Sequence, residues 1–233
     1  PGQALLPRGL RRLDHERRRL ETWVDGRRRA EGPFSDDRVP GLDPLGPEIF
    51  EADVINLHWV AGLVDYRRFF ARVPEGKPLV WTLHDMAPFT GGCHYANGCT
   101  RHEDRCGACP VLRSAAEDDA TRRSHDRRAA ALARLSPETT RIVAPSRWLA
   151  GEARRSSLFR RFDVEVIPNG LDTEVFAPRD RAEARALFGL PQDRQVVLFA
   201  AAGVKDPRKG FDLLEAALAG LATDPAPVLA AAG

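Results

Sequence analysis

The sequence predicts an α/β fold in which parallel strands alternate with helices. Short apolar runs, rich in β-branched residues, recur along the chain and are separated by longer, more polar runs that suit helices. Strands that alternate with helices in this way pair in parallel and carry the helices on the faces of the sheet. The hydrophobic content of 43% is enough for a buried core, and no apolar run reaches the roughly 20 residues that a membrane-spanning helix needs.

The predicted elements begin after residue 52 and follow one another closely. The expected strands are residues 53–59, 79–83, 141–144, 164–167, 195–202 and 228–232. The expected helices are residues 66–73, 114–135, 147–156, 181–188 and 211–221. Ser146 is a predicted N-cap, because its hydroxyl can accept hydrogen bonds from the first-turn amides of the helix that follows it.

Residues 1–47 are expected to form an arginine-rich arm followed by a loop. Arginines crowd residues 10–29, where a partial apolar stripe is compatible with a surface helix, and Pro, Gly and Asp are frequent in residues 32–47. The favoured interpretation is a solvated arm, and the alternative is contact with an anionic lipid surface or a nucleic acid. The net charge of +2 gives no general case for a polyanion, and the arm has few base-stacking aromatics, so we expect no nucleic-acid partner.

Two domains are predicted, with the boundary in a loop-like stretch that starts at residue 171. Residues 48–170 form the first domain, which includes a cysteine-rich loop at 86–112, and residues 171–233 begin the second. The second domain stops at the second strand of a strand–helix–strand unit, so we expect it to be truncated. The first residue is not Met, so we also expect that the natural chain starts further upstream.

The chemistry of the first domain is expected at the end of its central strand. The apolar run at residues 79–83 stops at His84 and Asp85, and ligands bind at the carboxyl ends of strands in open α/β sheets. This places two titratable side chains at a predicted ligand crevice. His58 ends the preceding strand and is a weaker candidate on the same argument. The alternative for each residue is a purely structural hydrogen bond.

All four cysteines of the chain fall in one loop with the spacing Cys-x5-Cys-x6-Cys-x2-Cys. They are Cys93, Cys99, Cys106 and Cys109. Three interpretations stay open: a structural zinc ion bound by four thiolates, reduced thiols that pack the loop, and disulfides, which an otherwise cytosolic composition disfavours. His94 or His102 can replace one cysteine as a zinc ligand. Four protein ligands leave no open position, so zinc here would be structural rather than catalytic.

The segment GVKDPRKG at residues 203–210 lies between a predicted strand and a predicted helix. Phosphate sites are often built this way, because exposed amides and the positive end of the helix dipole attract an anion. Gly203 and Gly210 allow close approach of the backbone, and Arg208 and Lys209 supply full charges. The alternative is an ordinary solvated turn.

Together these motifs resemble glycosyltransferase family 4, and most closely its bacterial members that build exopolysaccharide and other surface glycans. The resembling segments are DVINLHW (53–59), KPLVWTLHDMAPFTGGCHY (77–95), the cysteine motif that ends at Pro110, VAPSRWLA (143–150), VIPNGLDTEVFAP (166–178) and RKGFDLLEAAL (208–218). The resemblance implies a GT-B-like fold of two Rossmann-like domains that face each other across a cleft. It also implies retaining transfer of a sugar from a nucleotide-sugar donor to a glycan or lipid-linked acceptor in polysaccharide biosynthesis, with no cofactor required for catalysis.

Carried over by position, the resemblance assigns roles to residues of both predicted domains. His84 and Asp85 are the expected catalytic residues, and His84 is expected to reach the donor sugar. The expected contacts to the donor diphosphate are Gly203, Lys205, Arg208 and Lys209. Asn169 and Gly170 are expected in the donor-side loop between the domains. Many family members have a Gly-Arg pair where this chain has Ala202 and Gly203, so one cation of the family pattern is missing, and Lys205 is a candidate replacement.

The remaining expectations concern location and alternative functions. We expect a cytoplasmic protein. Contact of the arginine-rich arm with the inner face of the membrane stays an alternative to the solvated arm, because surface-glycan assembly commonly uses lipid-linked acceptors. Two other functions stay open: a nucleotide-sugar epimerase on the same fold, and a zinc-stabilised binding module. Because the predicted active site is incomplete, we expect the 233-residue chain to bind nucleotide sugar weakly and to turn over little.

Overall fold

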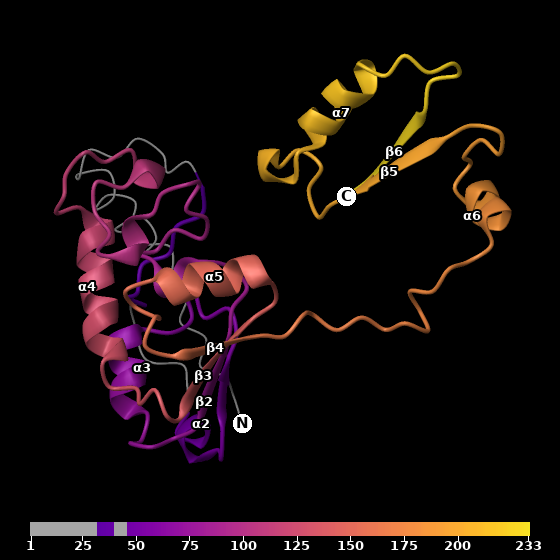
Figure 1. The fold of residues 1–233 in the computed structure, drawn as a ribbon. Coiled ribbons are helices and arrows are strands. Elements are labelled where there is room, and N and C mark those ends of the chain that lie inside the picture. The colour runs from indigo at the N-terminus through magenta and orange to yellow at the C-terminus, as the bar shows by residue number, and fades with distance from the viewer. Residues whose placement is uncertain (1–31, 40–45) are drawn as a thin grey trace, which may run out of the picture. The chain divides into compact units, whose positions relative to one another are not determined.

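The computed structural model describes residues 32–39 and 46–233, and it divides into two compact units between Asn169 and Gly170 (Figure 1). The predicted helix at residues 10–29 and the arginine runs of the arm lie outside the described residues. The sequence-based division had its boundary one residue later, after Gly170. Each unit combines helices with a parallel sheet, which confirms the predicted α/β fold class.

The first unit is built on a four-stranded parallel sheet. Its strands, in spatial order, are β1 (Ile55–Leu57), β2 (Leu79–Thr82), β3 (Thr140–Ala144) and β4 (Asp163–Val166). Leu57 pairs with Trp81, Trp81 with Ile142, and Ile142 with Val164, so one row of paired residues crosses the whole sheet. Because the strands are parallel, their carboxyl ends share one edge of the sheet, and in open α/β sheets ligands bind at that edge.

Trp81 lies at the centre of the hydrophobic core of this unit. It is 1% exposed, and the ring centroids of Tyr66, Phe70 and Phe159 lie 5.4 to 5.7 Å from its own. Burial alternates along β2, so Leu79 and Trp81 point into this core, whereas Val80 and Thr82 point to the other face. Large aromatic side chains therefore supply much of the apolar area that this unit buries.

Helices precede or connect the four strands. They are α2 (Glu48–Glu51), α3 (Tyr66–Arg72), α4 (Ala120–Leu132) and α5 (Arg147–Arg155). α3 packs against α4, whereas α5 packs against β3 and β4 (Figure 1). Ser146 caps α5 as predicted, since its Oγ accepts a hydrogen bond from the Leu149 amide at 3.2 Å.

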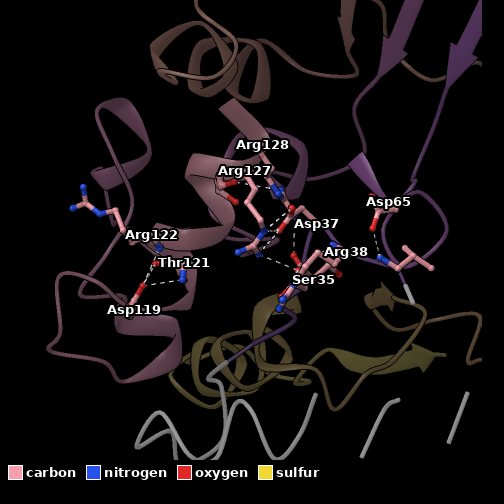
Figure 2. Close-up of polar contacts among 12 residues, drawn as sticks. Ser35, Asp37, Arg38, Asp65, Asp119, Thr121, Arg122, Arg127 and Arg128 are labelled. Carbon is pink, nitrogen blue, oxygen red and sulfur yellow. Dashed lines mark hydrogen bonds and ion pairs between the residues drawn. The ribbon is translucent and has the colours of Figure 1, made fainter. Parts of the chain in front are cut away.

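The helix predicted over residues 114–135 is shorter in the structure, because α4 begins only at Ala120. Asp119 ends the preceding irregular stretch. Its carboxylate accepts hydrogen bonds from the amides of Thr121 at 2.8 Å and Arg122 at 3.0 Å and so forms the N-cap (Figure 2). The composition of residues 114–118 suits a helix, but the cap fixes the start of the helix after them.

Arg128 of α4 holds two separate loops from inside the core. The residue is 2% exposed. Its guanidinium donates to the carbonyl of Ala87, to the carbonyl of Thr90 at 3.3 Å and to the carbonyl of Ser35 at 2.8 Å. A buried cation thus joins the loop after β2 to a segment that precedes β1 in the chain.

Arg127 fixes the same N-terminal segment, residues 32–39, from the partly exposed side of α4. Its guanidinium contacts the carboxylate of Asp37 at 2.6 to 3.1 Å and that of Asp36 at 3.3 Å (Figure 2). The amide of Tyr66 donates to the Asp37 carbonyl at 3.0 Å, which ties the segment to the start of α3 as well. Burial raises the pKa of Asp37 above its ordinary value, although the bonds from Arg127 act in the opposite direction.

The second unit pairs β5 (Val196–Ala200) in parallel with β6 (Val228–Ala232). The helices α6 (Arg181–Leu187) and α7 (Phe211–Ala219) accompany them. Phe199 of β5 packs against Phe211 of α7 with a ring-centroid distance of 5.0 Å. Residues 201–210 run from the carboxyl end of β5 to the start of α7, as the sequence predicts. Across residues 32–39 and 46–233, no helix is both long and apolar enough to cross a membrane.

We predict that Arg128→Met lowers the free energy of unfolding by about 3 kcal/mol, because it leaves buried carbonyl groups without a donor. Urea unfolding, followed by near-UV circular dichroism, measures the change. Arg123→Met is the matched control on α4: its side chain is 44% exposed, so we expect a change within about 0.5 kcal/mol. Equal effects of the two substitutions would contradict the role of Arg128.

Candidate functional site

Two histidines meet at the carboxyl edge of the first sheet. His58 follows β1 and His84 follows β2, and because these strands are neighbours the two side chains come together. The His58 Nδ1 and His84 Nε2 atoms are 3.0 Å apart, and both residues are exposed. One ring donates and the other accepts in this hydrogen bond. The pair therefore fixes the orientation of His84 while it stays accessible to a ligand.

Asp85, the other predicted catalytic residue, points the opposite way. It is 8% exposed. Its Oδ2 lies 2.6 Å from His94 Nδ1, and its Oδ1 accepts a hydrogen bond from the Ala87 amide at 2.8 Å. Both oxygens are thus engaged inside the protein. This arrangement favours a positioning role for Asp85 over direct contact with a substrate.

His94 extends this contact to Ser35, so that Asp85, His94 and Ser35 form a chain. The His94 Nε2 to Ser35 Oγ distance is 2.8 Å. A hydrolase triad has the same order of contacts, but it also needs amide donors for an oxyanion. The amide of Ser35 already donates to the Gly92 carbonyl at 2.8 Å. The chain is therefore better explained as a structural clamp under His84 than as a nucleophilic site.

The clamp depends on close approach of two backbone segments. Phe34 forms an antiparallel bridge with Cys93, and the His94 amide donates to the Pro33 carbonyl at 3.1 Å. A Cβ atom on Gly91 would lie 2.5 Å from the Thr121 carbonyl oxygen, and one on Gly92 would lie 2.5 Å from that of Ser35. Only glycine fits at these two positions. The sequence prediction assigned residues 32–39 to the loop of the arm and missed Ser35, because no local pattern marks a partner 59 residues away.

The four cysteines converge on one small space. All four, together with His102, line a cavity with a volume of about 20 Å³, which has room for about one water molecule or ion. Each cysteine is a free thiol. Burial raises the pKa of Cys93 to about 11 and that of Cys106 to about 12, so both are neutral at physiological pH.

The structure does not by itself assemble a metal site from these thiols. Within the described ranges, no three His, Cys, Asp or Glu side chains are grouped as metal ligands. Of the predicted substitute ligands, His94 is already bonded to Asp85 and Ser35. The Nε2 atom of His102 lies 3.2 Å from a carboxylate oxygen of Glu152 without forming a hydrogen bond to it. Zinc binding by these thiols stays a prediction.

Asp119 connects this cysteine loop to α4. Its Oδ2 accepts a hydrogen bond from the Cys109 amide at 2.9 Å, and its Oδ1 accepts one from the Thr121 hydroxyl at 2.6 Å. Burial tends to raise the pKa of Asp119, but these hydrogen bonds lower it more, so the pKa lies below its ordinary value. One buried carboxylate therefore fixes both the start of the helix and the end of the cysteine motif.

The predicted phosphate loop of the second unit presents its cations to solvent. Lys205, Arg208 and Lys209 are all exposed. Asp206 accepts a hydrogen bond from the Arg208 amide at 3.0 Å and binds its guanidinium at 2.5 Å, so Arg208 is partly neutralised. Gly210 has φ +73° and leads directly into α7, a left-handed conformation that favours glycine. The two lysines and the first amides of α7 can therefore face an anion.

The other predicted residues of this region have less definite surroundings. Asn169 and Gly170 are exposed and lie in an irregular stretch between β4 and α6. Gly203 accepts a hydrogen bond at its carbonyl from the Asp206 amide at 3.1 Å, and a side chain at this position would meet no neighbouring atom within 4 Å. The donor contacts of these residues stay predictions.

Comparisons with known proteins agree on one family. A family model described as Glycosyltransferase Family 4 matches residues 7–175. The chain is 32% identical over 185 residues to a D-inositol 3-phosphate glycosyltransferase of Nocardioides sp., which covers 79% of this chain and 33% of that protein. The corresponding protein of Segniliparus rotundus is 37% identical over 176 residues, with 75% and 33% covered.

A third relative comes from Escherichia coli. The putative colanic acid biosynthesis glycosyl transferase WcaC is 37% identical over 70 residues, which covers 29% of this chain and 17% of that protein. The aligned region therefore spans 33% of the length of the first two relatives and 17% of the length of the third.

We predict that alkylation of the buried thiols is slow in the native protein and that all four react after denaturation. Elemental analysis, with thiol titration before and after chelation, then tests the zinc prediction. One zinc ion per chain, with thiols released on chelation, would support a metal-clipped loop. Four thiols that react at once in the native protein, with no metal present, would contradict both the burial and the zinc site.

We predict that Asp119→Ala lowers the free energy of unfolding by about 2 kcal/mol, because buried amide donors lose their acceptor. The pKa of Asp119 in the folded protein lies below its ordinary value of 3.8, so the stabilisation by the ionised Asp119 carboxylate is complete above pH 3.8. It is lost as the pH falls from 3.8 through the folded pKa. Urea unfolding at neutral and acidic pH measures both effects.

Asp118→Ala is the control for this prediction, because the Asp118 side chain is 82% exposed one residue before the cap. We expect it to change the free energy of unfolding by less than about 0.5 kcal/mol. A similar loss in both variants would show that the N-cap is not the cause.

Proposed function

The chain belongs to glycosyltransferase family 4, and from this premise we propose that it serves the retaining transfer of a sugar from a nucleotide-sugar donor to a glycan or lipid-linked acceptor. The observation that carries the proposal is the exposed His84 at the carboxyl edge of the first sheet, held by His58 at 3.0 Å. Its ring can contact a hydroxyl of the donor sugar. Asp85 and His94 lie beneath it and hold the loop that follows.

The proposed reaction needs no protein nucleophile. The bond between C1 of the sugar and the diphosphate oxygen breaks, and its electron pair leaves with the nucleoside diphosphate. A new bond forms between C1 and the acceptor oxygen on the same face of the sugar. The proton of the acceptor hydroxyl passes to an oxygen of the leaving phosphate, which balances the step.

The charge that develops on the leaving group is the main electrostatic demand of this reaction. Lys209 is exposed two residues before the start of α7, where the helix dipole is positive, and Lys205 is exposed in the same loop. Fixed cations and amides at such a position stabilise the developing diphosphate charge. Because these groups supply that stabilisation, the proposal requires no catalytic metal or other cofactor.

The names of two relatives and the arginine runs of the arm suggest where this chain acts and in which biosynthesis. The names of the relatives describe transfer to an inositol phosphate and a role in colanic acid biosynthesis. We infer that this chain acts in polysaccharide biosynthesis in the cytoplasm. The arginine runs of residues 10–29 support contact with the anionic inner face of the membrane. A loss of vesicle binding when these arginines are replaced would support that contact, and no binding even at low salt would contradict it.

We predict that Lys209→Ala weakens the binding of free UDP or GDP about tenfold, a loss of about 1.4 kcal/mol, because it removes a cation next to the diphosphate. His84→Ala is expected to leave the binding of free UDP and GDP unchanged. It is expected to weaken the binding of the nucleotide sugar, by removing the part of the affinity that comes from the sugar. Isothermal calorimetry with UDP, GDP and their hexose conjugates separates the two effects. Arg181→Ala, an exposed cation on α6, is the matched control.

The reaction class is tested by product analysis. A radiolabelled nucleotide sugar is incubated with the protein, with and without a bacterial glycolipid fraction as acceptor. Label that moves to the lipid only when acceptor is present supports transfer. A donor sugar that changes configuration without any acceptor would instead support an epimerase and overturn the proposal.

A further inference from the structure

An open pocket lies between the cysteine loop and α5 in the first unit. Its volume is about 300 Å³, at the lower end of the range of small-molecule sites. Tyr95 and residues 96–100 of the cysteine loop form one wall, and Trp148, Glu152 and Arg155 of α5 form the other. None of these residues has a role in the proposed reaction.

Two aromatic residues of this pocket expose a large part of their side chains. Trp148 is 60% exposed and Tyr95 is 38% exposed, although both are large rings that usually lose most of their area on folding. Trp148 is the second residue of α5, two residues after the N-cap Ser146. The next residue, Leu149, packs into the core, whereas Trp148 does not. An exposed indole face suits a ligand with a flat apolar face and polar edges, which is the shape of a pyranose ring.

The charged side chains that line the pocket are paired with one another. Glu152 binds Arg155 directly, and the Arg155 Nε lies 3.1 Å from an oxygen of Glu103. Of these three side chains only Glu152 and Arg155 line the pocket, so its charged lining is one carboxylate paired with one guanidinium. This pairing leaves no excess positive charge to attract a phosphate or a nucleoside diphosphate. The pocket is therefore electrostatically unlike the lysine-rich loop of the second unit and suits a neutral polyhydroxylated ligand.

The shape of the rim is fixed by a tight turn. Asn97 and Gly98 both have positive φ, +49° and +83°, and the Cys99 amide donates to the Ala96 carbonyl at 2.9 Å. These are the features of a type I′ turn, which asparagine and glycine adopt most readily. The loop wall of the pocket is thus preformed rather than dependent on a ligand.

The pocket also lies next to the candidate catalytic edge. Met86 lines it, and Met86 is two residues after His84. Two extended residues span at most about 7 Å, so the Cα atoms of Met86 and His84 are no further apart than that. The backbone at this edge of the pocket is therefore close to the backbone of His84.

We propose that this pocket is a saccharide subsite that binds a neutral pyranose of the acceptor glycan against Trp148 and Tyr95. The assignment of this pocket to the acceptor rests on the proposed function. The affinity of the pocket for a saccharide does not depend on that function. The aromatic rings stack on the apolar face of the sugar, and Asn97, Glu152 and Arg155 offer hydrogen bonds to its hydroxyl groups.

The test uses the whole chain labelled with 5-fluorotryptophan and followed by fluorine NMR. Cellobiose, lactose and methyl α-mannoside are titrated at millimolar concentration, and UDP is titrated separately. We expect at least one saccharide to shift the resonance of Trp148, which the Trp148→Phe variant identifies, and we expect UDP to leave it unchanged. A saccharide series in which no member moves this resonance overturns the subsite.

Variants separate stacking from general effects on the fold. Trp148→Ala is expected to weaken saccharide binding about tenfold, and Trp148→Phe to retain part of the affinity. Phe188→Ala is the control, because Phe188 is an aromatic residue that is 74% exposed in the other unit. Saccharide affinity that survives in Trp148→Ala would overturn the subsite, and circular dichroism verifies that the variant stays folded.

The outcomes also distinguish this inference from the proposed function. UDP binding without any effect of saccharides on Trp148 overturns the subsite and leaves the transferase proposal standing. Saccharide binding at Trp148 without nucleotide binding or sugar transfer supports the subsite and overturns the transferase proposal. Competition between a nucleotide sugar and the free saccharide for Trp148 would show that the occupant is the donor sugar, which overturns the assignment to the acceptor.

Discussion

The buried guanidinium of Arg128 is the constraint on which the first unit depends. A cation in the core has no water to solvate it, so it must be surrounded by acceptors, and here these are carbonyls of Ala87, Thr90 and Ser35. The first two belong to the loop after β2 and the third to residues 32–39. Satisfying one charge therefore determines where both segments lie, and the candidate catalytic edge is built on them.

The same edge separates accessible groups from structural groups. His58 and His84 are exposed and free to contact a ligand, whereas Asp85 lies beneath them and is held by His94. This division is physically reasonable, because a carboxylate that already accepts two strong hydrogen bonds is a poor partner for a substrate but a good anchor for a loop. The glycines at 91 and 92 make the anchor possible by letting the backbones approach.

The two units carry complementary electrostatics. The first offers imidazoles and a pocket in which Glu152 is paired with Arg155, which suits neutral hydroxyl-bearing groups. The second offers exposed lysines at a helix start, which suits phosphate. A nucleotide sugar joins one group of each kind, so a protein that acts on it benefits from keeping the two environments on different units. This distribution of charge is compatible with the nucleotide-sugar donor that we propose.

The sequence by itself determined the parallel α/β architecture, the Ser146 cap and the place of His84 at a strand end, because periodicity, capping and strand order depend on neighbouring residues. Only the tertiary structure decided that Asp85 faces inward, that Ser35 completes its hydrogen-bond chain, that α4 starts after Asp119 and that four cysteines line one cavity. Each of these depends on contacts between segments far apart in the chain. No local pattern encodes such contacts, since they arise only when burial forces each polar group to find a partner.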